Sequence, residues 1–139
     1  MRKLLILTLA AGALAVPAAN ASSTHGRGGG HQNACHGRAN VMVVLKGTLA
    51  NDPNDGDTSF MLTVLHTNRW GRAYKDPALQ PVTVNVDTNT RYVKADQQVT
   101  LGALALNDQV VAKAKASRCS LLGGTPPTLT IKQVVDQTP

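Results

Sequence analysis

Five short apolar runs, separated by turn residues, constrain the fold of this chain more than any other feature of its sequence. The runs lie at residues 41–50, 59–68, 81–88, 109–117 and 128–137. In the third run Val82, Val84 and Val86 alternate with polar residues, which is the period of a strand with one buried face. Runs of this length, rich in β-branched residues and bounded by turn residues, predict strands. We therefore predict an all-β domain.

The acidic residues support this prediction, because all eight are aspartate and the chain has no glutamate. Glutamate is a common surface residue of helices, and its absence beside many Val and Thr residues favours strands. The chain has one Trp, two Tyr and one Phe. The core must therefore be built mainly from Val, Leu and Ile.

The segments between the runs predict how the strands are connected. The pair Asp55-Gly56 indicates a hairpin between the first two strands, and residues 96–106 have a spacing of Val and Leu that suits a short helix or helical turn better than a strand. Three strands, a helix and two strands, with Gly47 in the first strand, match a five-stranded Greek-key barrel of the OB-fold type. A five-stranded sandwich or an SH3-like barrel remains the alternative.

Three segments carry a resemblance to a known family. They are residues 41–49 with Gly47, the segment VNVDTNT at 84–90 and the segment LALNDQV at 104–110. Together they resemble a family of small secreted bacterial OB-fold domains of unknown function, although Asn107 stands where that family usually has glycine. The resemblance covers residue 41 to about residue 136. Its motifs are structural, so it implies the fold and little about activity.

Residues 1–21 have the pattern of a secretory signal peptide. Arg2 and Lys3 precede an apolar run at 4–16, and Ala19-Asn20-Ala21 is a small-x-small cleavage pattern. The run is shorter than the roughly 20 residues of a membrane span, so we expect cleavage and no span afterwards. The predicted organisation is a signal peptide at 1–21, a flexible Gly/His-rich tail at 22–40 and the barrel domain at 41–139. We expect a secreted or periplasmic location, which argues against genomic nucleic acid as partner.

The two cysteines, Cys35 and Cys119, are expected to form a disulfide in an oxidising compartment. In an OB barrel the first and fourth strands pair antiparallel. Cys35 lies just before the first strand and Cys119 just after the fourth, so this pairing would bring them together. A reduced Cys35 acting as nucleophile or metal ligand is the alternative.

The tail carries the candidate metal ligands His25, His31 and His36. Imidazoles bind copper, nickel and zinc, but the spacing is irregular, so a solvated tail without metal is the competing interpretation. No cofactor is expected. The loop at 51–58 has the composition of a calcium loop, but its glycine falls at the wrong position, and we interpret it as a polar hairpin turn.

The long connection after the second strand interleaves cations and aromatic residues. Aromatic rings and guanidinium groups suit the binding of sugars or strands of nucleic acid, and loops at the barrel mouth often bind ligands in OB domains. The alternative is that Trp70 packs over the end of the barrel. Lys113 and Lys115 share one face of the fourth strand and can extend a basic surface. The candidate ligand-binding residues are Arg69, Trp70, Arg72, Tyr74 and Lys75.

The charge balance and the absence of catalytic motifs complete the functional prediction. The chain has 14 basic residues, of which Arg2 and Lys3 leave with the signal peptide, so 12 remain against eight acids and the net charge is +4. It has no Ser-x-x-Lys motif and no nucleophile elbow. We expect a non-enzymatic module that binds an anionic or carbohydrate-like ligand, such as an anionic polymer, or an envelope protein. A metal-handling protein and a structural envelope component are the alternatives.

Overall fold

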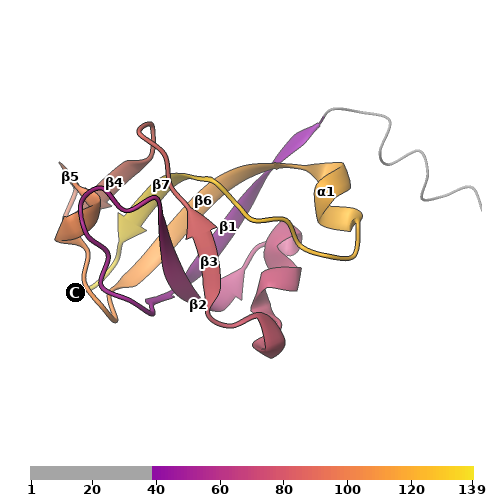
Figure 1. Ribbon diagram of the computed structural model, residues 1–139, viewed down its shortest axis with the longest axis horizontal. Coiled ribbons are helices and arrows are strands. Elements are labelled where there is room, and N and C mark those ends of the chain that lie inside the picture. The colour runs from indigo at the N-terminus through magenta and orange to yellow at the C-terminus, as the bar shows by residue number, and fades with distance from the viewer. Residues whose placement is uncertain (1–38) are drawn as a thin grey trace, which may run out of the picture.

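The computed structural model describes residues 39–139, which form one seven-stranded sheet with little helix (Figure 1). This confirms the all-β prediction. The five predicted runs all contain strands, and two further strands follow the third run. The strands are β1 (Asn40–Leu49), β2 (Ser59–Thr67), β3 (Val82–Asn85), β4 (Arg91–Lys94), β5 (Gln97–Val99), β6 (Gln109–Ser117) and β7 (Ile131–Asp136).

The order of the strands in the sheet is β3-β2-β1-β6-β7-β4-β5. All neighbours are antiparallel except β4 and β7, which are parallel. The predicted hairpin of the first two strands is confirmed by the pairing of β1 with β2. The predicted neighbourhood of the first and fourth strands is confirmed by the pairing of β1 with β6, which runs from Asn40↔Ser117 to Thr48↔Gln109.

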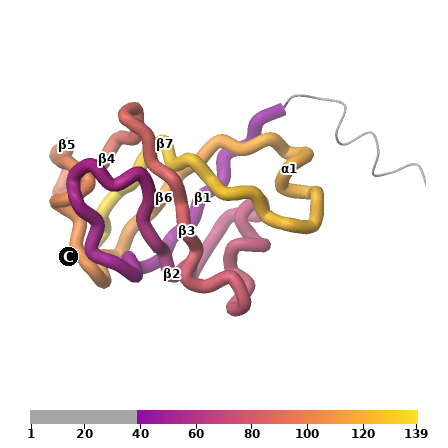
Figure 2. Tube along the Cα trace, in the orientation of Figure 1, coloured from indigo at the N-terminus to yellow at the C-terminus, as the bar shows by residue number. Residues whose placement is uncertain are grey.

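The sheet curls until β3, the strand at one of its edges, meets the chain just before β7. Asn85, at the end of β3, forms a parallel bridge with Thr130, and its N–H donates to the carbonyl of Leu129 at 2.8 Å. Figure 2 follows this path along the Cα trace. The result is a barrel-like sheet that encloses the core. The largest fully buried side chains are Phe60, Leu45, Leu49, Leu62, Leu104, Leu129, Ile131, Val43, Val84, Val110 and Val134.

Gly47 allows β1 to bend within this sheet. A Cβ at this position would lie 1.9 Å from the carbonyl oxygen of Thr63, which belongs to the backbone and cannot give way. The register between β1 and β2 shifts between Lys46 and Gly47. A register shift of this kind bends a strand and increases its twist, so the glycine lets one long strand curve around the core.

The short helix or helical turn predicted at 96–106 is confirmed only as a single turn. This segment forms strand β5 and a single 3-10 turn, η4 (Leu101–Ala103). Aspartate side chains bind two backbone N–H groups of this segment: Asp55 accepts from the N–H of Gly102 at 2.7 Å, and Asp108 accepts from the N–H of Ala105 at 2.9 Å. These N–H groups are therefore not available for helical hydrogen bonds.

The hairpin of β4 and β5 was not predicted. Its turn residues, Ala95 and Asp96, have positive φ angles of 49° and 61°, as a tight two-residue hairpin requires. Such turns usually contain Asn or Gly, so the pair Ala-Asp gives little signal in the sequence. The two strands are also too short for their alternation to be recognised.

The remaining elements divide the molecule into two ends (Figure 1). One end, here called the helical end, contains η2 (Arg69–Lys75), η3 (Pro77–Leu79) and α1 (Arg118–Leu122). The other, here called the hairpin end, contains the loop at 50–58, β4, β5, η4 and the C-terminus. Strands β1 and β6 connect the two ends.

Candidate functional site

Turn η2 lies across the helical end of the barrel because Gly71 lets its backbone approach the core. A Cβ at Gly71 would lie 1.9 Å from Oγ1 of Thr67 and 2.9 Å from Cδ2 of Leu45, a core residue. Asn68, just before the turn, fixes its start: its side-chain amide donates to the carbonyl of Met42 at 2.7 Å. The turn is therefore held against β1, and it presents Trp70 beside α1.

Trp70 is half-buried and packs against the core. Two guanidinium groups face its ring: the Cζ atom of Arg69 lies 4.5 Å from the ring centroid, and that of Arg118 lies 5.6 Å away. These distances are within the range of cation–π attraction. The ring therefore packs against the core and still keeps exposed surface, and its role in ligand binding stays a prediction.

A hollow of about 290 Å³ lies beside this ring. One wall comes from η2, with Arg69, Trp70, Arg72 and Ala73, and the other comes from α1, with Leu121 and Leu122. Leu122 is 55% exposed. The lining of the hollow thus combines apolar side chains with cationic ones. We call Arg69, Trp70, Arg72, Arg118, Leu121 and Leu122 the Trp70 cluster.

The structure does not bring all the predicted residues to this surface. Arg72 and Lys75 are exposed, but Tyr74 is 3% exposed and its hydroxyl donates to the carbonyl of Pro127. Burial raises the pKa of Tyr74 to about 12. Tyr74 therefore anchors η2 to the chain before β7 and is not part of the Trp70 cluster.

Sequence reasoning missed Arg118, Leu121 and Leu122. They lie about 50 residues from Trp70 in sequence, and nothing in their local pattern indicates a shared site. The pairing of β1 with β6 brings them together, because it ends at Ser117 and the N–H of Arg118 then donates to the carbonyl of Ala39 at 3.1 Å. The one available signal was the expected neighbourhood of the first and fourth strands.

The aspartates are engaged within the protein. Every aspartate of the chain lies in the part that the structure describes, and every one except Asp96 accepts a hydrogen bond from a backbone N–H. In the loop at 51–58, Asp52 accepts from Leu106 and Asp55 from Gly102. The carboxylates expected in a polar hairpin turn therefore hold that turn against η4 and the segment after it.

The cations behave differently. Within residues 39–139, Lys94 pairs with Asp108 and Asp136, and Lys132 pairs with Asp87. In that same part of the chain the other cations form no ion pair with a carboxylate, and residues 1–38 contain no Asp or Glu. The unpaired cations are Lys46, Arg69, Arg72, Lys75, Arg91, Lys113, Lys115 and Arg118.

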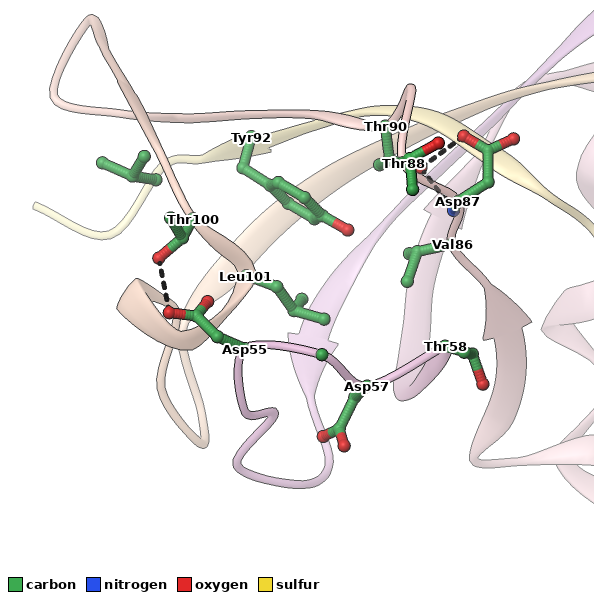
Figure 3. Close-up of a pocket in the computed structure, with 12 residues that line it drawn as sticks. Asp55, Asp57, Thr58, Val86, Asp87, Thr88, Thr90, Tyr92, Thr100 and Leu101 are labelled. Atoms are coloured by element: carbon green, nitrogen blue, oxygen red, sulfur yellow. Dashed lines mark hydrogen bonds between the residues drawn. The ribbon is translucent and has the colours of Figure 1, made fainter.

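A larger cavity of about 540 Å³ lies at the hairpin end (Figure 3). The ring of Tyr92 and the side chain of Leu101 point into it, and Asp55, Asp57 and Asp87 stand around it. Asp55 is hydrogen-bonded to Thr100 at 3.2 Å, and Asp87 pairs with Lys132. Because these carboxylates already have partners, we interpret the cavity as a gap between structural turns.

Several predicted site residues cannot be placed. Cys35, His25, His31 and His36 lie outside the described residues, so the disulfide with Cys119 and the metal site of the tail stay predictions. Within residues 39–139, no group of three or more His, Cys, Asp or Glu side chains is arranged to hold a metal ion. None of the helices in this same range is long and apolar enough to span a membrane.

We compared the chain with protein families, curated proteins and solved structures. No protein-family model, no curated protein and no solved structure matches the chain.

Proposed function

We propose that this protein is an exported, non-enzymatic binding module whose helical end recognises an anionic ligand. The observation that carries the proposal is the ring of Trp70, which has the guanidinium groups of Arg69 and Arg118 within 4.5 and 5.6 Å of its centroid and lines an open hollow. A flat ring framed by guanidinium groups can stack on one part of a ligand while the cations neutralise its negative charge.

The distribution of charge supports an anionic ligand over a cationic one. The guanidinium groups of the Trp70 cluster have no carboxylate partner within residues 39–139. Unpaired cations around a concave surface raise the local concentration of an anion and speed its association. Most carboxylates at the hairpin end offer no comparable surface, because all of them except that of Asp96 accept a hydrogen bond from a backbone N–H.

We further propose that the sheet is an OB-type barrel in which β3 and β4 together act as the third of five strands. Four pairings support this proposal: β1 with β2, β1 with β6, β3 with β2, and β4 parallel to β7. The single turn η4 would then stand where the usual helix lies. Since this fold serves many functions, the binding proposal rests on the Trp70 cluster and not on the fold.

The secreted or periplasmic location also remains a proposal, and the suggested partners follow from it. Anionic polymers and envelope proteins are partners that an exported module of this kind would meet. The close approach of Ala39 and Arg118 supports the disulfide expected in that compartment, because Cys35 and Cys119 lie within four residues of this contact.

Trp70 provides its own test, because it is the only tryptophan of the chain. Dextran sulfate should change its fluorescence in a saturable manner, and neutral dextran of the same length should not. Arg118→Gln should weaken this response, whereas Lys132→Gln, which removes the same charge from β7, outside the Trp70 cluster, should leave it unchanged. An equal response to both polymers, or none to either, would remove the support for an anionic ligand.

A further inference from the structure

The outward face of β1 and β6 carries three lysines in a regular arrangement. The inward residues of these strands include Val43, Leu45, Val110, Ala112 and Ala114, all fully buried. Successive side chains of a strand point to opposite faces. Lys46, Lys113 and Lys115 therefore lie on the outside of the barrel-like sheet, together with Met42 and Val44.

The pairing register sets the spacing of these lysines. Lys115 lies opposite Met42, Lys113 lies opposite Val44, and Lys46 lies opposite Val111. The three lysines thus follow one another along the strand direction in steps of two residues, which corresponds to roughly 7 Å per step. An extended polymer with regularly repeated charges can contact all three at once.

This row of lysines leads to the Trp70 cluster. Strand β6 ends at Ser117, two residues after Lys115, and Arg118 follows directly with its guanidinium 5.6 Å from the ring of Trp70. The N–H of Arg118 donates to the carbonyl of Ala39. The three lysines and Arg118 therefore extend alongside residues 46 to 39. Seven residues of a strand correspond to roughly 24 Å.

No carboxylate interrupts this face. The outward neighbour of Lys113 on β7 is Gln133, whose Oε1 accepts from Nζ of Lys113 at 3.2 Å. The aspartate of β7, Asp136, has a side chain only 1% exposed and pairs with Lys94. The face therefore has a single sign of charge along its length, a property that attracts polyanions.

We propose that a linear anionic polysaccharide binds along this face, from Lys46 past Lys113 and Lys115 to Trp70. The inference rests on the proposed function and extends it from a local site to an extended one. A sugar polymer fits better than single-stranded nucleic acid, because proteins that bind such strands stack successive bases on several aromatic rings. Here Trp70 is the one aromatic residue near the row, since Phe60 and Tyr74 are buried and Tyr92 lies at the hairpin end.

The length of the ligand tests this proposal. The protein is titrated with heparin fragments from disaccharide to decasaccharide, and with alginate fragments of the same lengths, while Trp70 fluorescence is recorded. Affinity should rise with length until the row is filled and then level off. A rise for both series indicates that charge alone is recognised, and a rise for one indicates whether sulfate or carboxylate is preferred; either result supports the proposal.

The variant Lys46→Gln/Lys113→Gln/Lys115→Gln separates the row from the Trp70 cluster. It should weaken the longest fragments roughly tenfold, because exposed ion pairs contribute about 0.2–1 kcal/mol each. It should leave the disaccharide unchanged. The slope of the logarithm of the binding constant against the logarithm of the salt concentration should also decrease in size, by up to about one for each lysine removed. Lys132→Gln on β7 serves as the control outside both the row and the Trp70 cluster, and thermal melting verifies that each variant is folded.

Three outcomes would overturn the proposal. If short and long fragments bind equally and the triple variant binds normally, the row has no role, although the proposed function at Trp70 stands. If no fragment changes the fluorescence, the proposed function fails as well. If oligo(dT) of matched length, or vesicles containing phosphatidylglycerol, bind more tightly than every sugar fragment, the partner is a nucleic acid or a membrane.

Discussion

The two ends of this small barrel use charge in opposite ways. At the hairpin end, the carboxylates of Asp52, Asp55 and Asp57 accept hydrogen bonds from backbone N–H groups. At the helical end, the guanidinium groups of Arg69 and Arg118 lie over Trp70, without a carboxylate partner in residues 39–139. The comparison teaches that the aspartates of the hairpin end stabilise its turns, whereas the guanidinium groups of the helical end are available to contact a partner.

The exclusive use of aspartate follows from this division. An aspartate side chain is short enough to bind a backbone N–H two or three residues away, and such bonds fix turns. Asp76, Asp87 and Asp136 do this for Ala78, Asn89 and Thr138. Glutamate is longer and is less suited to these positions. The composition therefore reflects the number of tight turns in the chain.

The largest effect should come from the covalent tie that we propose at the helical end. A disulfide between Cys35 and Cys119 would close a loop of 84 residues, which the chain-entropy model values at up to about 4.5 kcal/mol. Cys119→Ser should lower the free energy of unfolding by a large part of this amount. Chemical denaturation with and without reductant measures it, and wild type treated with reductant should match the variant. Two alkylatable thiols in folded, unreduced protein would contradict the disulfide.

A second large effect on stability is expected at the hairpin end. Nζ of Lys94 lies 2.8 Å from both Oδ2 of Asp108 and Oδ2 of Asp136, and these carboxylates are mostly buried. Lys94→Met would leave them without a counter-charge. Because the side chain of Lys94 is itself 37% exposed, the expected loss is about 1–3 kcal/mol, below that for a fully buried pair.

The matched control for Lys94→Met is Lys115→Met on the outward face of β6. A surface substitution of this kind should change stability by less than about 0.5 kcal/mol. The two variants therefore compare a cation that the fold needs with one that it does not. Equal losses of stability in both would remove the distinction between the two ends.

Binding should show the reverse pattern. Trp70→Phe keeps an aromatic ring that can pack on the core, whereas Trp70→Ala removes the stacking surface, whose contacts are typically worth about 1–3 kcal/mol. Trp70→Ala should weaken dextran sulfate binding roughly ten- to a hundredfold, and Trp70→Phe should weaken it less. Calorimetry measures both, because the fluorescent residue is lost. Normal binding by a folded Trp70→Ala protein would exclude the Trp70 cluster as the site.

The smallest effect is the dependence of stability on pH. Desolvation raises the pKa of Asp136, but hydrogen bonds from Lys94 and Thr138 outweigh it, so its pKa lies below the ordinary 3.8. Hydrogen bonds to Asp108 and Asp136 raise the pKa of Lys94 above 10.5. The contribution of Asp136 is complete above its ordinary pKa and is lost as pH falls through the lower folded value. That of Lys94 is complete below 10.5 and is lost as pH rises through the higher folded value.

The unfolding free energy should therefore decline below about pH 4 and above about pH 10.5. Denaturant titrations across this range measure the decline. Lys94→Met should have a flatter profile at both extremes. A profile that Lys94→Met leaves unchanged would show that Lys94 and Asp136 do not carry the dependence.

The sequence predicts the strands well where their signal is local. The alternation of Val82, Val84 and Val86 marks a strand with one buried face, and all three residues are buried. The turn Ala95-Asp96 was missed because its positive φ angles depend on context and not on glycine. The helical segment expected at 96–106 is limited to one turn because Asp55, a residue distant in sequence, accepts the hydrogen bond of the Gly102 N–H.

The candidate site could be predicted only in part. The sequence identifies Arg69, Trp70 and Arg72 because cations and a ring stand together in one loop. It does not reveal that Tyr74 points into the core. The sequence of a tight turn does not indicate which of its side chains pack against the core and which face the solvent. Arg118 requires the register of β1 and β6, which no local pattern contains.

The most direct test of the difference between the two ends is to measure NMR chemical-shift perturbations of the amides in ¹⁵N-labelled protein titrated with a heparin tetrasaccharide. The account predicts saturable shifts at the indole N–H of Trp70 and at the amides of Arg118 and Lys115. The amides of Gly102 and Asn89 at the hairpin end should stay in place. Shifts concentrated around Gly102 and Tyr92, with none at Trp70, would contradict the account.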